Sequence, residues 1–405
     1  MFSNNTVSII KCFYPILFFM KTSFIILALF TTGLLHGQLP TEFFKGRTTG
    51  ILPFLKYGLG EDRLGGTKLT YLDTGIVLKV VDSIRNDYKV QLSQGHFAYL
   101  PKRYFVRNDS IPTKPMHLTA SARVYGDEQF DYVTLQLDER LPYRSMQQVN
   151  SSKIIVDVFG VTTNTNWITQ LKSAKTIKNF YYEQLEDDVF RMTIELNNDQ
   201  HWGYSINYNR NTLIVKVKRP PAKLKAKDLV IVLDAGHGGA HIGAKGLSGI
   251  QEKDYTLLIT KEIEKYLRKK NVSVHMTRTE DSTMEMPERI NIAKQVNPDL
   301  LLSIHLNSSS NKTVKGVSTY YRHIGFKPVS TFILDRMLDL NLNNFGNIGS
   351  FNFSLNGPTD YNNCLLEVAF LSNADDEKRI MDPDFHKKVA KQVYKGLKDW
   401  MKSIR

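Results

Sequence analysis

Four residues in the C-terminal half of the 405-residue chain are of types that together could carry out metal-assisted hydrolysis: His237, Glu252, His305 and Glu367. Two histidines and one carboxylate are the usual three protein ligands of a catalytic zinc ion, and such a set leaves a fourth position open for water. A second glutamate that is not a ligand can act as the general base that takes a proton from this water. The residue types therefore predict a zinc hydrolase.

Three of these residues stand at the ends of continuous apolar runs, which are typical of buried parallel strands. In open α/β sheets, ligands bind outside the carboxyl ends of the strands, so side chains from separate strand ends are expected to converge there. The runs are 229–233, followed by a glycine-rich turn with His237; 300–304, followed by His305; and 364–368, which contains Glu367.

Glu252 precedes the segment 255–267, where apolar residues recur at helical spacing, so it is expected at the N-terminal edge of a helix. By itself it is more often a helix-start carboxylate stabilised by the helix dipole, and a single histidine after an apolar run is more often bonded to backbone. Glu367 is harder to explain by structure alone, because a buried carboxylate without a partner is costly. The four residues together favour a metal site.

Further motifs surround these residues in a fixed order. Their order and spacing resemble the zinc-dependent N-acetylmuramoyl-L-alanine amidases of the amidase-3 type, which cut bacterial peptidoglycan, and the resemblance covers residues 227–402. The motifs are Asp-Ala-Gly-His-Gly-Gly at 234–239, Gly-Ala at 243–244, Glu-Lys-Asp at 252–254, Thr-Arg at 277–278, Arg-Ile-Asn-Ile-Ala at 289–293, Ser-Ile-His-Leu-Asn at 303–307 and Glu-Val-Ala-Phe-Leu-Ser-Asn at 367–373.

This resemblance implies that His237, Glu252 and His305 hold one zinc ion and that Glu367 is the catalytic carboxylate. It implies a peptidoglycan hydrolase that cleaves the amide bond between N-acetylmuramic acid and L-alanine. Two other functions stay open: a zinc peptidase or deacetylase acting on another amide, and a catalytically inactive cell-wall-binding protein.

Two further residues are candidates for contacts with the substrate. Arg289 could hold a substrate carboxylate through a bidentate contact, and the alternative for it is a structural ion pair. Asn307 belongs to the same motif as His305. The chain departs from the family pattern at Lys294 and Ala369, which puts fine substrate contacts in question and leaves the four chemical residues untouched.

The catalytic domain, 228–402, is expected to be α/β, with a mostly parallel central sheet and helices on both faces. All-β domains are expected before it. Residues 60–110 resemble a small bacterial Src-homology-three-like β-barrel, and 116–218 resemble the β-sandwich-like targeting domain of such amidases, with 219–227 as a linker.

The region 60–218 is expected to dock the enzyme on the cell wall. It contains no catalytic cluster and is rich in aromatic residues, whose plainer role is core packing while an exposed subset could stack on sugar rings. A chain that begins near Lys225 is therefore expected to hydrolyse a soluble wall fragment about as well as the whole protein.

Residues 1–37 read as a signal peptide, with Met20 as an alternative start and an uncleaved anchor as the alternative to cleavage near Gly37. The sequence therefore predicts a periplasmic or secreted protein without a stable membrane span after cleavage. The net charge of +13 favours an anionic polymer as partner. No zinc-finger, homeodomain or basic-zipper pattern occurs, so peptidoglycan is expected rather than nucleic acid. The sequence identifies no protein activator.

Overall fold

The computed structural model describes residues 43–60 and 65–404. The predicted signal peptide, 1–37, lies outside the described residues. In the described part of the chain, no helix has both the length and the apolar character needed to cross a membrane.

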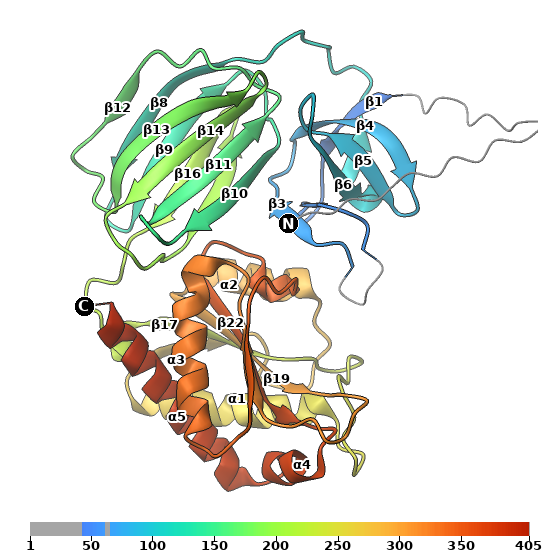
Figure 1. Ribbon diagram of the computed structural model, residues 1–405, viewed down its shortest axis with the longest axis vertical. Coiled ribbons are helices and arrows are strands. Elements are labelled where there is room, and N and C mark those ends of the chain that lie inside the picture. Colours follow the sequence, from blue (N-terminus) through green and yellow to red (C-terminus); the bar gives the residue numbers. More distant parts are fainter. Residues whose placement is uncertain (1–42, 61–64, 405) are drawn as a thin grey trace, which may run out of the picture. The chain divides into compact units, whose positions relative to one another are not determined.

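Seven antiparallel strands between Phe44 and Arg107 form the first sheet, which we call the N-terminal sheet (Figure 1). Their order is β3-β2-β6-β5-β4-β1-β7. The sheet starts earlier than the predicted range 60–110, because two strands before residue 60 pair with later ones. The strands are β1 (Phe44–Thr48), β2 (Phe54–Lys56), β3 (Lys68–Tyr71), β4 (Val77–Ile84), β5 (Asp87–Gln91), β6 (Phe97–Pro101) and β7 (Phe105–Arg107).

Residues 119–218 form two further sheets, of four and five strands, whose inner apolar side chains share one core. Their orders are β10-β11-β14-β13 and β12-β8-β9-β16-β15. Alternating buried residues such as Ile154, Val156 and Val158 explain why these segments form half-buried strands. The strands are β8 (Thr119–Gly126), β9 (Phe130–Leu137), β10 (Tyr143–Gln148), β11 (Lys153–Phe159), β12 (Ile168–Gln170), β13 (Ile177–Glu186), β14 (Val189–Leu196), β15 (Tyr204–Asn209) and β16 (Thr212–Lys218).

The C-terminal domain is built on a six-stranded sheet in the order β18-β17-β19-β22-β20-β21. Every neighbouring pair is parallel except β20 with β22, so the mostly parallel sheet is confirmed. The strands are β17 (Val230–Ala235), β18 (Ser273–Met276), β19 (Leu300–Asn307), β20 (Val317–Tyr320), β21 (Asn344–Ile348) and β22 (Asn362–Phe370).

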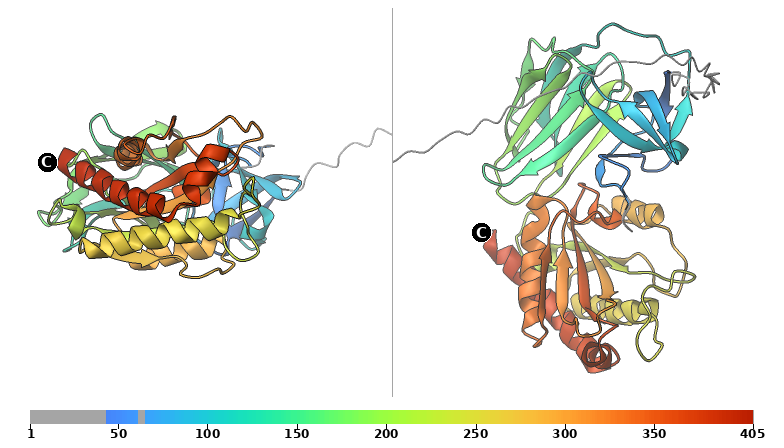
Figure 2. Two further views of the ribbon diagram at one scale, coloured as in Figure 1. Left: turned by 90° about the horizontal axis from the view of Figure 1, so that it is seen from below. Right: turned by 45° about the vertical axis from the view of Figure 1, so that its right-hand side comes forward.

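Helices cover both faces of this sheet, as predicted. Ile231 and Leu233 of β17 point into the core shared with α1, α3 and α5, whereas Val232 between them points into the core on the α2 side. Helices α1 and α5 run side by side on one face (Figure 2). The helices are α1 (Glu252–Lys269), α2 (Met286–Val296), α3 (Lys327–Leu338), α4 (Ala374–Ile380) and α5 (Pro383–Ser403).

The predicted linker 219–227 does not separate two independent halves, because residues 41–405 form one compact unit. Trp400 of α5 is fully buried, donates a hydrogen bond to Gln200 at 3.0 Å and packs beside Trp202. Lys218 at the end of β16 forms an ion pair with Asp299 at 2.9 Å.

Candidate active site

The predicted site residues lie together where the central strands of the C-terminal sheet end. His305 on β19 is directly opposite Glu367 on β22, and Glu252 is the first residue of α1. His237 follows β17 after one glycine. All four line one cavity of about 810 Å³, so the structure brings together the residues that the sequence singled out.

His237, Glu252 and His305 offer one ligand atom each, and these atoms all lie within 4.8 Å of one another. One carboxylate oxygen of Glu252 is 3.1 Å from Nε2 of His237, and the other is 3.0 Å from Nδ1 of His305. Two imidazole nitrogens and a carboxylate oxygen form the donor set that a catalytic zinc site uses, with a position left for water or substrate.

Two observations show that these residues suit a cation. Nε2 of His305 is buried and has no hydrogen-bond partner, which is costly for a polar atom unless something else satisfies it. Burial alone would raise the pKa of Glu252, but hydrogen bonds with His237 and His305 hold that pKa well below its ordinary value. Backbone N–H groups of Ala244 and Leu306 also donate to the carboxylate, so Glu252 is held ionised as a metal ligand must be.

The loop that carries His237 has a backbone that requires its glycines. His237 itself lies in the left-handed region, with φ of 63°, a conformation that non-glycine residues adopt mainly where surrounding structure enforces it. A Cβ atom on Gly236 would lie 2.5 Å from the His305 ring, and one on Gly243 would lie 2.5 Å from the Glu252 carboxylate. Glycine at these positions lets the predicted ligands approach one another.

Two buried arginines form hydrogen bonds with the backbone of this loop. Arg278 donates hydrogen bonds to the carbonyl oxygens of Ala235 and Gly236, each at 2.9 Å. Arg289 donates to the carbonyl oxygens of Ala235 at 2.8 Å and His237 at 2.6 Å. The loop carbonyls are therefore satisfied without water, which fixes the backbone of His237.

Arg289 is 1% exposed and forms an ion pair with Asp234 at 2.7 Å. Burial would raise the pKa of Asp234, but the Arg289 guanidinium and the hydroxyls of Ser303 and Thr277 lower it. Arg289 thus makes the structural ion pair that the sequence left open as the alternative to a substrate contact. It does not belong to the residues that line the cavity.

Asn307 does line the cavity, where its amide nitrogen is 3.3 Å from the Tyr320 hydroxyl. The lining residues that were not singled out from the sequence include Lys312, Phe351 and Phe353. The spacing of the two phenylalanines is the only local signal for them, because apolar side chains at i and i+2 of an extended segment point the same way.

Comparisons with known proteins identify the family of the catalytic domain. Residues 231–399 match the family described as N-acetylmuramoyl-L-alanine amidase, and residues 122–217 match the AMIN domain. Over 208 residues the chain is 31% identical to the probable cell wall amidase LytH of Staphylococcus aureus, which covers 50% of this chain and 67% of that relative. The chain belongs to the N-acetylmuramoyl-L-alanine amidase family. The predicted family, and the targeting domain before it, are confirmed.

A second relative of this amidase extends the similarity into the N-terminal region. The N-acetylmuramoyl-L-alanine amidase AmiC of Escherichia coli is 22% identical over an alignment 369 positions long, which covers 69% of this chain and 88% of that relative. Among solved structures, the catalytic domain of the amidase CwlV from Bacillus (Paenibacillus) polymyxa is 30% identical, with a TM-score of 0.41 over 44% of this chain and 99% of that one. The amidase AmiC2 of Nostoc punctiforme is 28% identical, with the same TM-score and coverage.

Proposed function

We propose that this amidase holds one zinc ion on His237, Glu252 and His305 and hydrolyses the bond between N-acetylmuramic acid and L-alanine with Glu367 as its proton carrier. The observation that supports this most is the convergence of three ligand atoms within 4.8 Å of one another in the cavity that Glu367 also lines. The family to which the chain belongs is described by its action on the amide between N-acetylmuramic acid and L-alanine.

Zinc bound at such a site lowers the pKa of water and polarises the carbonyl group of the scissile amide. Glu367 takes a proton from the attacking water as the water oxygen bonds to the carbonyl carbon. It then gives this proton to the nitrogen of L-alanine as the C–N bond breaks. The products are a carboxylate on the muramic acid and a peptide with a free amino terminus.

We propose that the region before the catalytic domain docks the enzyme on peptidoglycan, in the periplasm or outside the cell. The AMIN match covers the two sheets of residues 119–218. Of the aromatic residues in this region, Trp167 is 68% exposed and Tyr181 is 38% exposed, whereas Phe159 and Phe180 are buried in the core. Exposed aromatic rings and a net charge of +13 suit a glycan polymer that carries carboxylates.

The metal assignment can be tested by substituting one predicted ligand. His305→Ala should bring zinc content well below one ion per chain and abolish release of peptides with a free L-alanine amino terminus, because two ligands hold zinc poorly. Zinc is measured by elemental analysis and the products by mass spectrometry. His275→Ala, at an exposed position on β18, is the matched control and should keep both. Full zinc and activity in His305→Ala would show that the ligand assignment is wrong.

A further inference from the structure

One side of the active-site cavity is formed by residues 351–353, which we call the aromatic wall. Phe351 and Phe353 both line the cavity. The Phe353 ring meets the His305 ring edge-on, with 5.6 Å between centroids and 86° between planes, and the Phe351 ring is 4.6 Å from that of Tyr320. A shift of the aromatic wall would therefore change the shape of the cavity.

Asn352, between the two phenylalanines, is 8% exposed and bonds with the N-terminal sheet instead of the cavity. Its Oδ1 accepts a hydrogen bond from the backbone N–H of Lys68 at 3.1 Å, and its Nδ2 donates to the carbonyl oxygen of Gly66 at 3.2 Å. These partners lie 284 and 286 positions away along the chain. The amide thus uses both its acceptor and its donor on one short stretch of backbone.

Arg322 joins the same two segments a second time. Its guanidinium donates to Oδ1 of Asn352 at 2.8 Å and to the carbonyl oxygen of Lys68. Burial lowers the pKa of Arg322 below its ordinary value. Hydrogen bonds shielded from water are stronger than those at the surface. The bonds of Arg322 and Asn352 are therefore well suited to fix the position of the aromatic wall.

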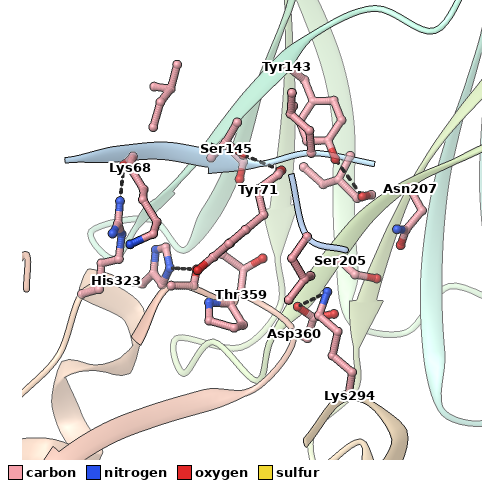
Figure 3. A pocket seen from close by; sticks show the side chains of 18 residues that line it. Lys68, Tyr71, Tyr143, Ser145, Ser205, Asn207, Lys294, His323, Thr359 and Asp360 are labelled. Atoms are coloured by element: carbon pink, nitrogen blue, oxygen red, sulfur yellow. Dashed lines mark hydrogen bonds and ion pairs between the residues drawn. The ribbon is translucent and has the colours of Figure 1, made fainter. Parts of the chain in front are cut away.

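The chain after the aromatic wall is held by the same neighbours. The Tyr71 hydroxyl on β3 is 3.4 Å from the carbonyl oxygen of Ser354, and the His323 ring is 2.8 Å from the carbonyl oxygen of Gly357. Tyr71 and His323 both line a small cavity of about 70 Å³ (Figure 3). Asn352 is the residue of the aromatic wall whose side chain makes the connection to the N-terminal sheet.

We propose that Asn352 is a positioning residue through which the N-terminal sheet holds the aromatic wall in the shape that binds substrate. The N-terminal sheet then contributes to substrate binding. Neither family match includes this sheet, because the matches cover residues 122–217 and 231–399. The proposal rests on the proposed function, because it assumes that the cavity with Glu367 is where the amide is hydrolysed.

The test compares steady-state kinetics of the full chain and its Asn352→Ala variant on a soluble N-acetylmuramoyl-peptide. KM is expected to rise about fivefold or more, because the hydrogen bonds that hold the wall are lost, while kcat changes by less than about twofold. Zinc content should stay at the wild-type value, since the three predicted ligands are unchanged. Asn291→Ala, an exposed asparagine on α2, is the matched control and should leave KM unchanged.

A double substitution shows whether Asn352 acts through the wall. Phe353→Leu changes the wall directly, and if Asn352 only positions that wall, the double variant should raise KM by less than the product of the two single effects. If Asn352→Ala does not fold, Arg322→Lys replaces it under the same criterion, because lysine keeps the charge and loses the forked contact to Asn352 and Lys68.

A folded, zinc-loaded Asn352→Ala protein with the wild-type KM would overturn the positioning role, as would fully multiplicative effects with Phe353→Leu. This result differs from a failure of the proposed function. In that case the wild-type chain itself would release no peptide with a free L-alanine amino terminus.

Discussion

Glu367 and the three predicted ligands have different proposed roles, and substitutions can separate them. Glu367 is half-buried and lies directly opposite His305 on the adjacent parallel strand. A general acid–base group contributes roughly 10²–10⁴-fold to a rate, so Glu367→Gln should lower kcat by about this factor while zinc content and thermal unfolding stay at wild-type values. A decrease of less than about tenfold would contradict the role, and loss of zinc would make Glu367 a ligand.

Among the elements, strand β17 and helix α2 depend on each other through the buried pair of Asp234 and Arg289. Both side chains are 1% exposed, and Arg289 also holds the carbonyl oxygen of His237. Removing one partner of such a pair leaves an uncompensated charge, so Arg289→Met should lower the free energy of unfolding by roughly 3–5 kcal/mol.

Urea unfolding of Arg289→Met checks this value. The double variant Asp234→Asn with Arg289→Met should be destabilised by less than the sum of the two single variants, because it buries no unpaired charge. Additive effects would instead show that the two side chains stabilise the fold independently. Lys387→Met, which removes an exposed ion pair with Asp384 on α5, serves as the control and should leave the free energy of unfolding almost unchanged.

At the scale of the whole molecule, binding to the cell wall should be separable from hydrolysis by substituting surface residues. Truncating the chain should not separate the two. A chain that begins near Lys225 would expose the buried face of Trp400 and lose the contact of Asn352 with Lys68. The expectation that such a chain works as well as the whole protein is therefore not supported by these contacts. Single surface substitutions are the better experiment.

Trp167→Ala should weaken sedimentation of the full chain with insoluble peptidoglycan, because stacking of sugar rings on the exposed indole is lost, and should leave hydrolysis of a soluble fragment unchanged. Leu258→Ala removes a 48% exposed apolar side chain on α1 and is the control. Added salt should weaken binding of the wild-type chain if its net charge of +13 contributes. Unchanged sedimentation of Trp167→Ala would exclude this ring from the docking surface.

The sequence by itself predicted the elements of the catalytic domain and singled out the four candidate site residues that line one cavity in the structure. Apolar runs before His237 and His305 and around Glu367 form buried parallel strands, because only such runs can be covered on both faces. A residue at the end of a buried strand reaches the edge of the sheet wherever the neighbouring strands lie. Local pattern was therefore sufficient to predict that these side chains meet.

Only the tertiary structure decided which groups Arg289 and Asn352 contact. An arginine in a motif has the same appearance whether it faces a substrate or a buried carboxylate, and the 1% exposure of Arg289 identifies the second case. Asn352 bonds with backbone 284 residues away, and no sequence pattern encodes which distant carbonyl or N–H group an amide will meet. Such contacts are set by how separately formed sheets pack against one another, which depends on all their side chains together.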